Sequence, residues 1–212
     1  MTSPATSATA PSLRALALTC SLKKSPTPSS SDLIADQLLA ELGKAGVEGA
    51  KQRCVDLALL PGTEADMGPG DEWPALLDRI KRADILVLST PTWVGHMSSV
   101  AQRVLERLDA ELSDKDNAGR PVMVGKVAVA AVVGNEDGAH KIVADLFQAL
   151  NDIGFSIAAQ GCTYWNGEAM QGTNFNDLDE VPEAVAGVTA TAARNAVHLA
   201  GLLRHQPYPP YE

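Results

Sequence analysis

The chain has 212 residues, of which 45% are hydrophobic and 20% are charged, and its formal net charge is −9. This length is enough for one large domain with a sizeable core. The acidic charge argues against binding to nucleic acid, because non-specific affinity depends on Lys and Arg neutralising phosphates. No apolar run approaches the roughly 20 residues that span a bilayer. We therefore expect a globular protein that binds neither nucleic acid nor membrane.

The three cysteines, Cys20, Cys54 and Cys162, lie far apart in the sequence. They form no CxxC pair and no Cys/His spacing typical of a metal site, so we expect neither a disulfide framework nor a bound metal. This use of cysteine favours a reducing compartment, and we expect a cytoplasmic protein.

The start of the chain differs in composition from the rest. Residues 1–12 are rich in Ser, Thr, Ala and Pro, and they lack the apolar core of a signal peptide. We predict a flexible N-terminal arm over residues 1–12, one domain over residues 13–205 and a C-terminal tail over residues 206–212.

Segments with the patterns of strands and helices alternate along the chain. The strongest strand prediction is continuously apolar from Ile85 to Leu88, as expected of a parallel strand covered on both faces. The predicted strands are Ala15–Thr19, Gln52–Leu57, Ala83–Thr90, Gly125–Val133 and Gly154–Ala159. The predicted helices are Ser31–Ala45, Glu72–Arg82, Ser99–Leu112, Ala139–Ile153 and Ala184–Leu203. This alternation predicts an α/β fold, with a parallel sheet and helices on both faces.

Polar loops follow three of the predicted strands, beginning at Thr19, Thr90 and Val133. In such sheets, ligands bind beyond the carboxyl ends of the strands, where the strand order reverses. We therefore expect the three loops to meet at one edge. The segment Gln160–Pro182 has no clear periodicity, and a loop of this length is usually functional or packs on a partner.

The first of these loops, Cys20–Asp32, runs from a strand directly into a helix. It has neither a Walker A sequence nor GxGxxG, so a nucleoside triphosphate or a pyrophosphate is not favoured. Hydroxyls beside a helix N-terminus instead favour a single phosphate. The candidate phosphate ligands are Ser21, Lys23, Ser29, Ser30 and Ser31. An ordinary N-cap, in which serine bonds the free amides of the helix, is the alternative interpretation.

The second and third loops have features suited to a planar ring. In the second, Pro91 fixes one backbone angle, Gly95 permits close approach and Trp93 offers a flat apolar wall. Core packing or an oligomer contact is the alternative for Trp93. The third loop, residues 134–140, could pass over the far side of the same ring, although its Asn, Asp and Gly are also typical of a simple turn.

No set of side chains in the sequence predicts acid–base or nucleophilic catalysis. There is no GxSxG elbow, and no spacing predicts a Ser/His/Asp triad. Glu136 and Asp137 would point in different directions on a helix. His96 is as readily a surface imidazole as a functional one, and His140, in a first helical turn, is more often solvated than catalytic. We therefore assign no catalytic residue and expect a bound cofactor to carry the chemistry.

Together the loops resemble the flavodoxin-like superfamily, and within it the group of NADPH-dependent FMN reductases and NAD(P)H:quinone oxidoreductases. The matching blocks, between about Leu13 and Leu203, are ALALTCSLKKSPTPSSSD, ILVLSTPTWVGHMSSVAQRVLERLD, VVGNEDGAH and TYWNGEAMQGTNFND. The second and third blocks are the most specific. The resemblance implies a flavodoxin-like three-layer sandwich with a five-stranded parallel sheet in the order 2-1-3-4-5. It also implies non-covalent FMN and a homodimer or homotetramer.

The resemblance also assigns roles to residues by position. The FMN phosphate falls to Ser21, Ser29, Ser30 and Ser31. The isoalloxazine ring and ribityl chain fall to Pro91, Thr92, Trp93, Val94 and Gly95. The opposite side of the site falls to Gly134, Asn135, Glu136 and Gly138. Tyr164 and Trp165 are expected at the same site or a neighbouring one.

These features support three functional hypotheses. The first is an FMN-dependent oxidoreductase that passes electrons from NAD(P)H, a transient donor, to a small acceptor such as a quinone, a flavin, a nitro or azo compound, or a metal ion. The alternative is a flavodoxin-like electron carrier for protein partners, with which the net charge of −9 is compatible. The third is a scaffold without flavin that serves as an interaction module, because fold alone does not define function.

Overall fold

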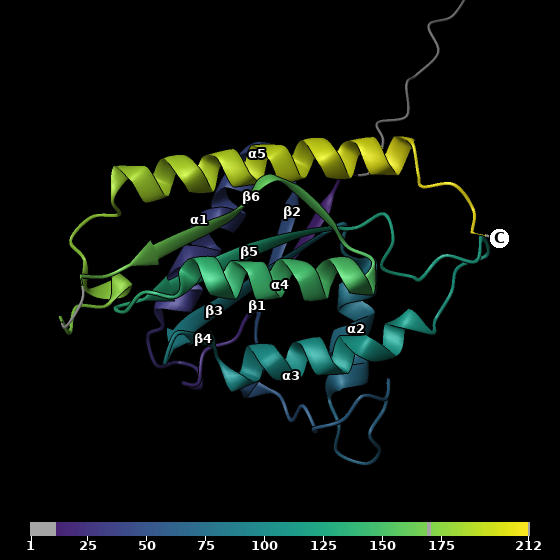
Figure 1. The fold of residues 1–212 in the computed structure, drawn as a ribbon, viewed down its shortest axis with the longest axis horizontal. Helices are drawn as coiled ribbons and strands as arrows, with labels where there is room; N and C mark the ends of the chain where they lie inside the picture. The colour runs from purple at the N-terminus through teal and green to yellow at the C-terminus, as the bar shows by residue number, and fades with distance from the viewer. Residues whose placement is uncertain (1–11, 169–170, 212) are drawn as a thin grey trace, which may run out of the picture.

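The computed structural model describes residues 12–168 and 171–211. Its centre is a sheet of parallel strands in the order β2-β1-β3-β5-β6, with the short β4 paired antiparallel to β3 (Figure 1). The strands are β1 (Arg14–Thr19), β2 (Glu48–Arg53), β3 (Ile85–Trp93), β4 (His96–Met97), β5 (Val127–Gly134) and β6 (Ser156–Asn166). Counted along the chain, the parallel strands have the expected order 2-1-3-4-5, so the flavodoxin-like sheet is confirmed. The sixth strand, β4, was not predicted.

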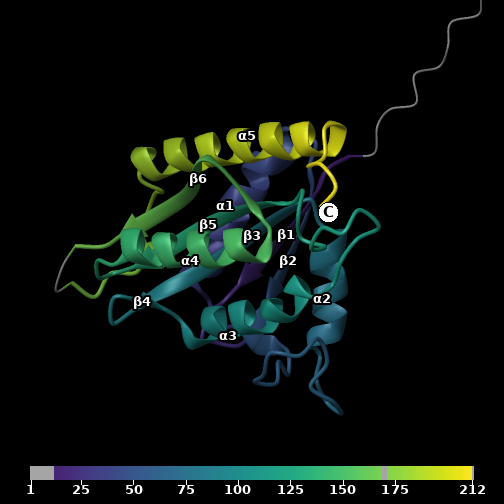
Figure 2. The same cartoon turned by 45° about the vertical axis from the view of Figure 1, so that its right-hand side comes forward.

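Helices cover both faces of the sheet, as Figures 1 and 2 show. Helices α1 and α5 pack on one face, and α2, α3 and α4 pack on the other. Their bounds are α1 (Ser30–Lys44), α2 (Trp73–Arg82), α3 (Ser99–Leu108), α4 (Ala139–Ile153) and α5 (Glu183–His205). Three short 3₁₀ helices are η1 (Cys54–Asp56), η2 (Asp109–Leu112) and η3 (Phe175–Asp177). Within the described ranges, no helix is both long and apolar enough to cross a membrane.

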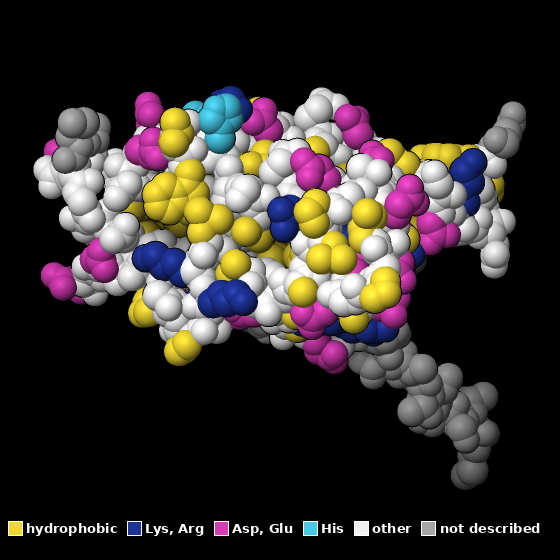
Figure 3. Space-filling view, turned by 90° about the horizontal axis from the view of Figure 1, so that it is seen from below, with side chains coloured by type: hydrophobic (Ala, Val, Ile, Leu, Met, Phe, Trp, Pro, Cys, Tyr) yellow, Lys and Arg dark blue, Asp and Glu magenta, His cyan; other side chains and the backbone are white. Residues whose placement is uncertain are grey.

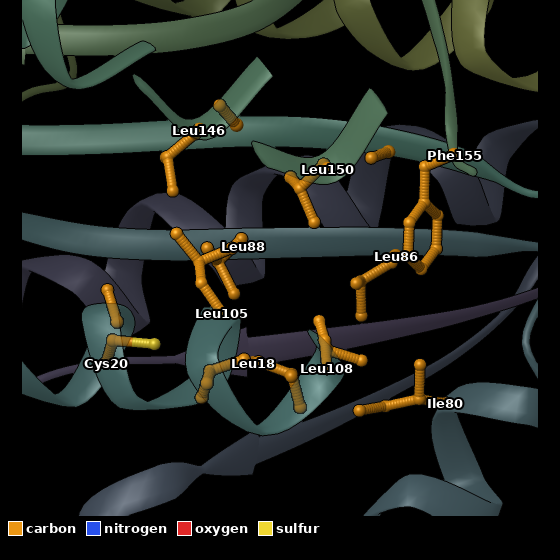
Figure 4. Close-up of a cluster of buried hydrophobic side chains, with 14 of the residues drawn as sticks. Leu18, Cys20, Ile80, Leu86, Leu88, Leu105, Leu108, Leu146, Leu150 and Phe155 are labelled. Carbon is orange, nitrogen blue, oxygen red and sulfur yellow. The ribbon is translucent and has the colours of Figure 1, made fainter. Parts of the chain in front are cut away.

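The middle of the sheet is apolar on both sides. In β3, Leu86 and Leu88 face α2, α3 and α4, whereas Ile85 and Val87 face α1 and α5. Figure 4 shows the first of these clusters, in which leucines from the strands and helices pack together, with Phe155 beside Leu86 at the right of the view. Burying a side chain of this size stabilises the fold by about 1.5–3 kcal/mol. A continuously apolar strand therefore belongs in the centre of the sheet.

Strand β2 occupies Glu48–Arg53, so the predicted strand Gln52–Leu57 was placed too late. Its sequence, EGAKQR, has no apolar period, and its first residues are exposed because β2 lies at the edge of the sheet. Parallel pairing of Arg14 with Glu48 sets its register instead. A 3₁₀ turn then begins at Cys54, where the strand was expected to continue.

Strand β6 continues well beyond Ala159, where the predicted strand ended. Gln160 has a φ of 52°, and the register with β5 shifts between Ala128 and Ala130. These features mark a bulge, after which the strand resumes its pairing. The first part of the segment predicted as a loop is therefore a strand that carries Trp165 to the carboxyl edge of the sheet.

Some predictions fall outside the described residues. The N-terminal arm includes residues 1–11, which are not described. Residues 169–170 of the late block and residue 212 of the tail also lie outside the described ranges.

A buried ion pair holds the long loop between η1 and α2. The Arg107 guanidinium lies 2.7 Å from the Asp71 carboxylate, and both side chains are 0% exposed. Arg107 also donates to the carbonyls of Leu60 and Glu64, at 2.8 and 2.9 Å. Burial alone would raise the pKa of Asp71. The Arg107 guanidinium and the backbone amides that donate to the Asp71 carboxylate together hold that pKa well below its usual range. This loop has no regular structure of its own, and Arg107 and Asp71 supply several of the hydrogen bonds that hold it.

Candidate functional site

A cleft lies beyond the carboxyl ends of β1, β3, β5 and β6, with about 630 Å³ of empty space that is partly open to solvent. This is the edge at which a doubly wound sheet places its ligands. Figure 3 shows hydrophobic side chains gathered near this end of the molecule, at the left of the view, with Lys and Arg side chains beside them. The cleft is lined by Ser21, Leu22, Lys23, Ser29, Ser30, Ser31, Pro91, Thr92, Trp93, Val133, Gly134, Asn135, Trp165, Asn174, Phe175 and Asn176.

One end of the cleft is formed by the loop between β1 and α1. Ser29 is the N-cap of α1, but its side chain makes no capping hydrogen bond. Ser31 is 1% exposed, and its hydroxyl has no hydrogen-bond partner among the described residues. A buried hydroxyl without a partner costs free energy, so an ordinary cap does not explain these serines. All five residues predicted for the phosphate line this end.

The second wall is a tight hairpin that joins β3 to β4. Val94 and Gly95 have φ angles of 53° and 71°, as a two-residue type I′ turn requires. Trp93 is 50% exposed and Val94 is 85% exposed, so the hairpin presents apolar surface to solvent. Pro91, Thr92 and Trp93 line the cleft, whereas Val94 and Gly95, which were predicted with them, belong to the turn and do not.

The third loop fastens this hairpin from the side of β5. The Val94 amide donates to the Glu136 carboxylate at 2.9 Å. A Cβ on Gly138 would lie 3.0 Å from the Cα of Gly95, so the two backbones are in close contact. Glu136 and Gly138 therefore position the hairpin and do not line the cleft, whereas Gly134 and Asn135 do.

Gly134 is required where the third loop meets the hairpin. A Cβ at this position would lie 2.6 Å from the Cβ of Thr92, a distance that forces the chain to shift. Thr92 is 4% exposed, and its hydroxyl has no hydrogen-bond partner among the described residues. The wall of the cleft therefore contains a second buried hydroxyl without a partner among the described residues.

A fourth wall was only partly predicted and comes from the end of β6 and from η3. The ring of Trp165 lies 5.5 Å from the ring of Phe175. Asn176 hydrogen-bonds with the Ser30 side chain, which joins this wall to the start of α1. Asn174 and Asp177 form a capping box that fixes η3. The sequence block TYWNGEAMQGTNFND showed the polar and aromatic residues of this wall. It did not show that they form the end of a strand and a 3₁₀ turn.

The histidines and Tyr164 lie outside the cleft lining. His140 bonds the Tyr164 hydroxyl at 2.9 Å, with the two rings edge to face. His96 contacts the Lys141 ammonium at 3.2 Å. Tyr164 projects from β6 toward the α2–α4 face, whereas its neighbour Trp165 packs with the α1–α5 face and lines the cleft.

The chemistry of the lining suits a flavin phosphate. Among the described lining residues, Lys23 is the ionisable side chain, and none is Asp, Glu or His. One end offers hydroxyls, an ammonium group and the N-terminus of α1 for an anion. The other end offers aromatic and aliphatic walls, including Trp93 and Trp165, for a flat ring. The two buried hydroxyls without partners, on Ser31 and Thr92, match a ligand rich in oxygen atoms.

Comparison with known proteins agrees with the chemistry of this cleft. The fold defines a flavodoxin-like protein, with a cleft at the edge of the sheet where such folds place their ligands. The family model described as NADPH-dependent FMN reductase matches residues 13–169. The chain therefore belongs to the NADPH-dependent FMN reductase family.

Several known proteins are similar to the chain. It is 29% identical over 206 residues to 8-demethyl-8-aminoriboflavin-5′-phosphate synthase of Streptomyces davaonensis, covering 92% of this chain and 80% of that protein. A crystal structure of RosB with bound 8-demethyl-8-formylriboflavin-5′-phosphate superposes with a TM-score of 0.85 and 28% identity, covering 93% of this chain and 82% of that one. The apo NADH:FMN oxidoreductase EMOB has the same fold, with a TM-score of 0.64, 20% identity and coverage of 94% and 95%.

One relative is much longer than this chain. The chain is 36% identical over 169 residues to a protein of Mycobacterium bovis named divalent metal cation transporter MntH. The match covers 78% of this chain but spans only 25% of that protein.

Membership of the family confirms the predicted class of protein: an NAD(P)H-dependent oxidoreductase that uses FMN. It does not favour the alternative of an electron carrier. The family acts on small molecules, as predicted.

Proposed function

We propose that the cleft binds riboflavin 5′-phosphate and that the protein transfers electrons from NAD(P)H through it to a small acceptor. The acceptor classes are quinones, flavins, nitro or azo compounds, and metal ions. The observation that carries this proposal is the two-ended cleft, which has serine hydroxyls and Lys23 at the start of α1 and aromatic walls opposite. The described lining holds no carboxylate or imidazole that could act as a general acid or base.

The residues of the cleft have different roles in this proposal. Ser21, Ser29, Ser30, Ser31 and Lys23 bind the phosphate. Pro91, Thr92 and Trp93, with Gly134 and Asn135, hold the ring and ribityl chain, and Trp165 and Phe175 keep water from its inner side. When bound, FMN supplies hydride acceptance and electron transfer, while the protein supplies binding and orientation. Four residues act indirectly, because they hold the hairpin in place and do not line the cleft: Val94, Gly95, Glu136 and Gly138.

A second candidate function differs in the fate of the flavin. The similarity to RosB, at a TM-score of 0.85, is stronger than the similarity to the FMN oxidoreductase EMOB, at 0.64. The RosB structure holds a riboflavin 5′-phosphate that carries a formyl group at position 8. This observation favours a protein in which the flavin phosphate is itself the substrate and leaves chemically altered. Both candidates place the same phosphate at the start of α1.

One experiment tests the proposal and separates the two candidates. The purified protein is supplied with FMN, and NADPH is then added without oxygen while the visible flavin absorbance is followed. Rapid bleaching, with flavin of unchanged mass recovered after reoxidation, is the result expected of the reductase. In a parallel sample kept in air, which supplies an oxidant for the group at position 8, recovery of flavin with a changed mass would support the substrate role. A protein that does not bind FMN would contradict both.

We also propose that the protein is a cytoplasmic homodimer or homotetramer. Cys20, Cys54 and Cys162 are free thiols, which is compatible with a reducing compartment. The exposed Trp93 and Val94 at the mouth of the cleft offer apolar surface to a second copy. Light scattering on the purified protein measures the mass of the assembly, and a strictly monomeric species would contradict this part of the proposal.

A further inference from the structure

Arg53, the last residue of β2, is 8% exposed. Its side chain hydrogen-bonds to the loop that forms the phosphate end of the cleft. One terminal nitrogen of its guanidinium donates to the carbonyls of Lys23 and Thr27, at 3.0 and 2.8 Å. Its Nε donates to the Asp32 carboxylate at 3.2 Å, and the other terminal nitrogen bonds the same oxygen. Arg53 therefore ties two points of the loop to the first turn of α1.

The partners of Arg53 adjoin the cleft, whereas Arg53 does not line it. Lys23 is a lining residue, and Asp32 directly follows Ser31, whose buried hydroxyl has no partner among the described residues. The planar guanidinium fork can hold several acceptors at once in one geometry. A change at Arg53 therefore reaches the cleft through the loop, not through contact with a ligand.

Arg53 also neutralises a negative charge at the N-terminus of α1. Asp32 is an acidic residue in the first turn of α1, and an uncompensated carboxylate there would repel a bound phosphate. Burial by itself would raise the pKa of Asp32, but the Arg53 guanidinium, the Thr19 side chain and the Lys51 charge together outweigh it and lower that pKa. Asp32 thus stays ionised and is neutralised chiefly by Arg53, with the Lys51 ammonium 3.8 Å away.

We propose that Arg53 is a positioning residue that makes the site selective for flavin phosphate over unphosphorylated riboflavin. It does so by fixing the phosphate loop and by neutralising Asp32. The inference rests on the proposed function, because it deepens the assignment of that end of the cleft to a phosphate.

The test compares the dissociation constants for FMN and for riboflavin in the wild type and in Arg53→Met, by titration of flavin fluorescence. In Arg53→Met we expect the dissociation constant for FMN to rise on the order of tenfold to a hundredfold, the range of lost charge-assisted hydrogen bonds. The constant for riboflavin should change by less than about threefold, because riboflavin leaves the phosphate end empty. Equal losses for both flavins, or no loss for either, would overturn the proposal.

Three further variants complete the test. Arg79→Met is the matched control, because Arg79 bonds the Gln52 side chain and lies away from the cleft lining. Its ratio of the two constants should equal that of the wild type. Arg53→Lys keeps the charge but not the fork, and it should lose affinity for FMN selectively. If Arg53→Met does not fold, the two dissociation constants of Arg53→Lys test the role of Arg53.

The double variant Arg53→Met with Asp32→Asn tests the charge step alone. It should bind FMN several-fold more tightly than Arg53→Met, because the repulsive carboxylate is gone. A double variant no better than Arg53→Met would overturn the neutralisation step. Failure of the wild type to bind FMN would contradict the proposed function, whereas a wild type that binds FMN with variants that lose both flavins equally would contradict only the role of Arg53.

Discussion

Arg107 and Arg53 each pair with an aspartate and bond the carbonyls of a loop, but they lie in different parts of the molecule. Arg107 and Asp71 are fully buried, and their loop between η1 and α2 stands apart from the cleft lining. Arg53 and Asp32 are slightly exposed, and their loop forms one end of the cleft. The same chemical pair therefore serves stability in one place and ligand selectivity in the other. The location of the loop, not the pair, decides which.

The two ion pairs, Arg107–Asp71 and Arg53–Asp32, should differ most in their effect on stability, and the largest loss of stability should come from Arg107→Met. This change leaves Asp71 buried without its partner and frees several loop carbonyls. We expect a loss of about 3–5 kcal/mol in the free energy of unfolding, measured by denaturant titration.

The matched control for Arg107→Met is Arg103→Met on the same helix. Arg103 is partly exposed and donates to the Leu59 carbonyl at 3.1 Å. We expect its loss to be within about 1 kcal/mol. Equal losses in the two variants would remove the distinction between a buried ion pair and a peripheral hydrogen bond.

Acid should affect the Asp71 pair more than the Asp32 pair. Both carboxyl pKa values are lowered in the folded protein, and that of Asp71 is lowered strongly. A carboxyl group with a lowered pKa stabilises the fold above its unfolded pKa, about 3.9. That contribution is lost as the pH falls below this value toward the folded pKa.

The measurement for acid is the free energy of unfolding between neutral pH and about pH 3 in the wild type, Asp71→Asn and Asp32→Asn. The steep acid loss of the wild type should flatten most in Asp71→Asn. Asp71→Asn should also be less stable at neutral pH, because Arg107 then lacks its counter-ion. A steeper dependence in Asp71→Asn than in the wild type would contradict the assignment.

The smallest effect should come from two serine hydroxyls at the N-terminal ends of α1 and α3. Ser31 has a buried hydroxyl without a partner, whereas the Ser98 hydroxyl donates to the Cys20 carbonyl at 2.6 Å and accepts from the Ala101 amide at 3.1 Å. Ser31→Ala should change the free energy of unfolding by less than about 0.5 kcal/mol and raise the dissociation constant for FMN about threefold to tenfold. Ser98→Ala should instead cost about 1–2 kcal/mol of stability, because it removes a cap. The reverse pattern would place the ligand elsewhere.

Much of the fold was predictable because it depends on neighbouring residues. The helix Ala139–Ile153 was predicted with its observed bounds, since its apolar spacing and Gly154 at its end are local signals. The apolar core of β3 was equally clear. The predictions failed at β2, whose edge position leaves no apolar pattern, and at the bulge of β6, where Gln160 and Gly161 resemble the end of a strand.

The candidate site divides in the same way. The serine loop, the Trp93 loop and Gly134 with Asn135 were predicted because each directly follows a recognisable strand, and the structure places them around one cleft. Of the fourth wall only Trp165 was predicted, whereas Phe175 and Asn176 were not, because they follow a strand whose end could not be located. Val94, Gly95, Glu136 and Gly138 were placed in the lining, but they hold the hairpin instead.

The sequence by itself determined the alternation of strands and helices, the apolar centre of the sheet and the three polar loops at its edge. These features follow from side-chain patterns over a few consecutive residues. Only the tertiary structure decided which distant groups meet, such as Arg53 with Lys23, 30 positions apart, and Ser30 with Asn176, 146 positions apart. Such polar contacts leave no periodic trace in the sequence, because a hydrogen bond depends on the position and angle of two groups in space. The phosphate end of the cleft is built from contacts of this kind.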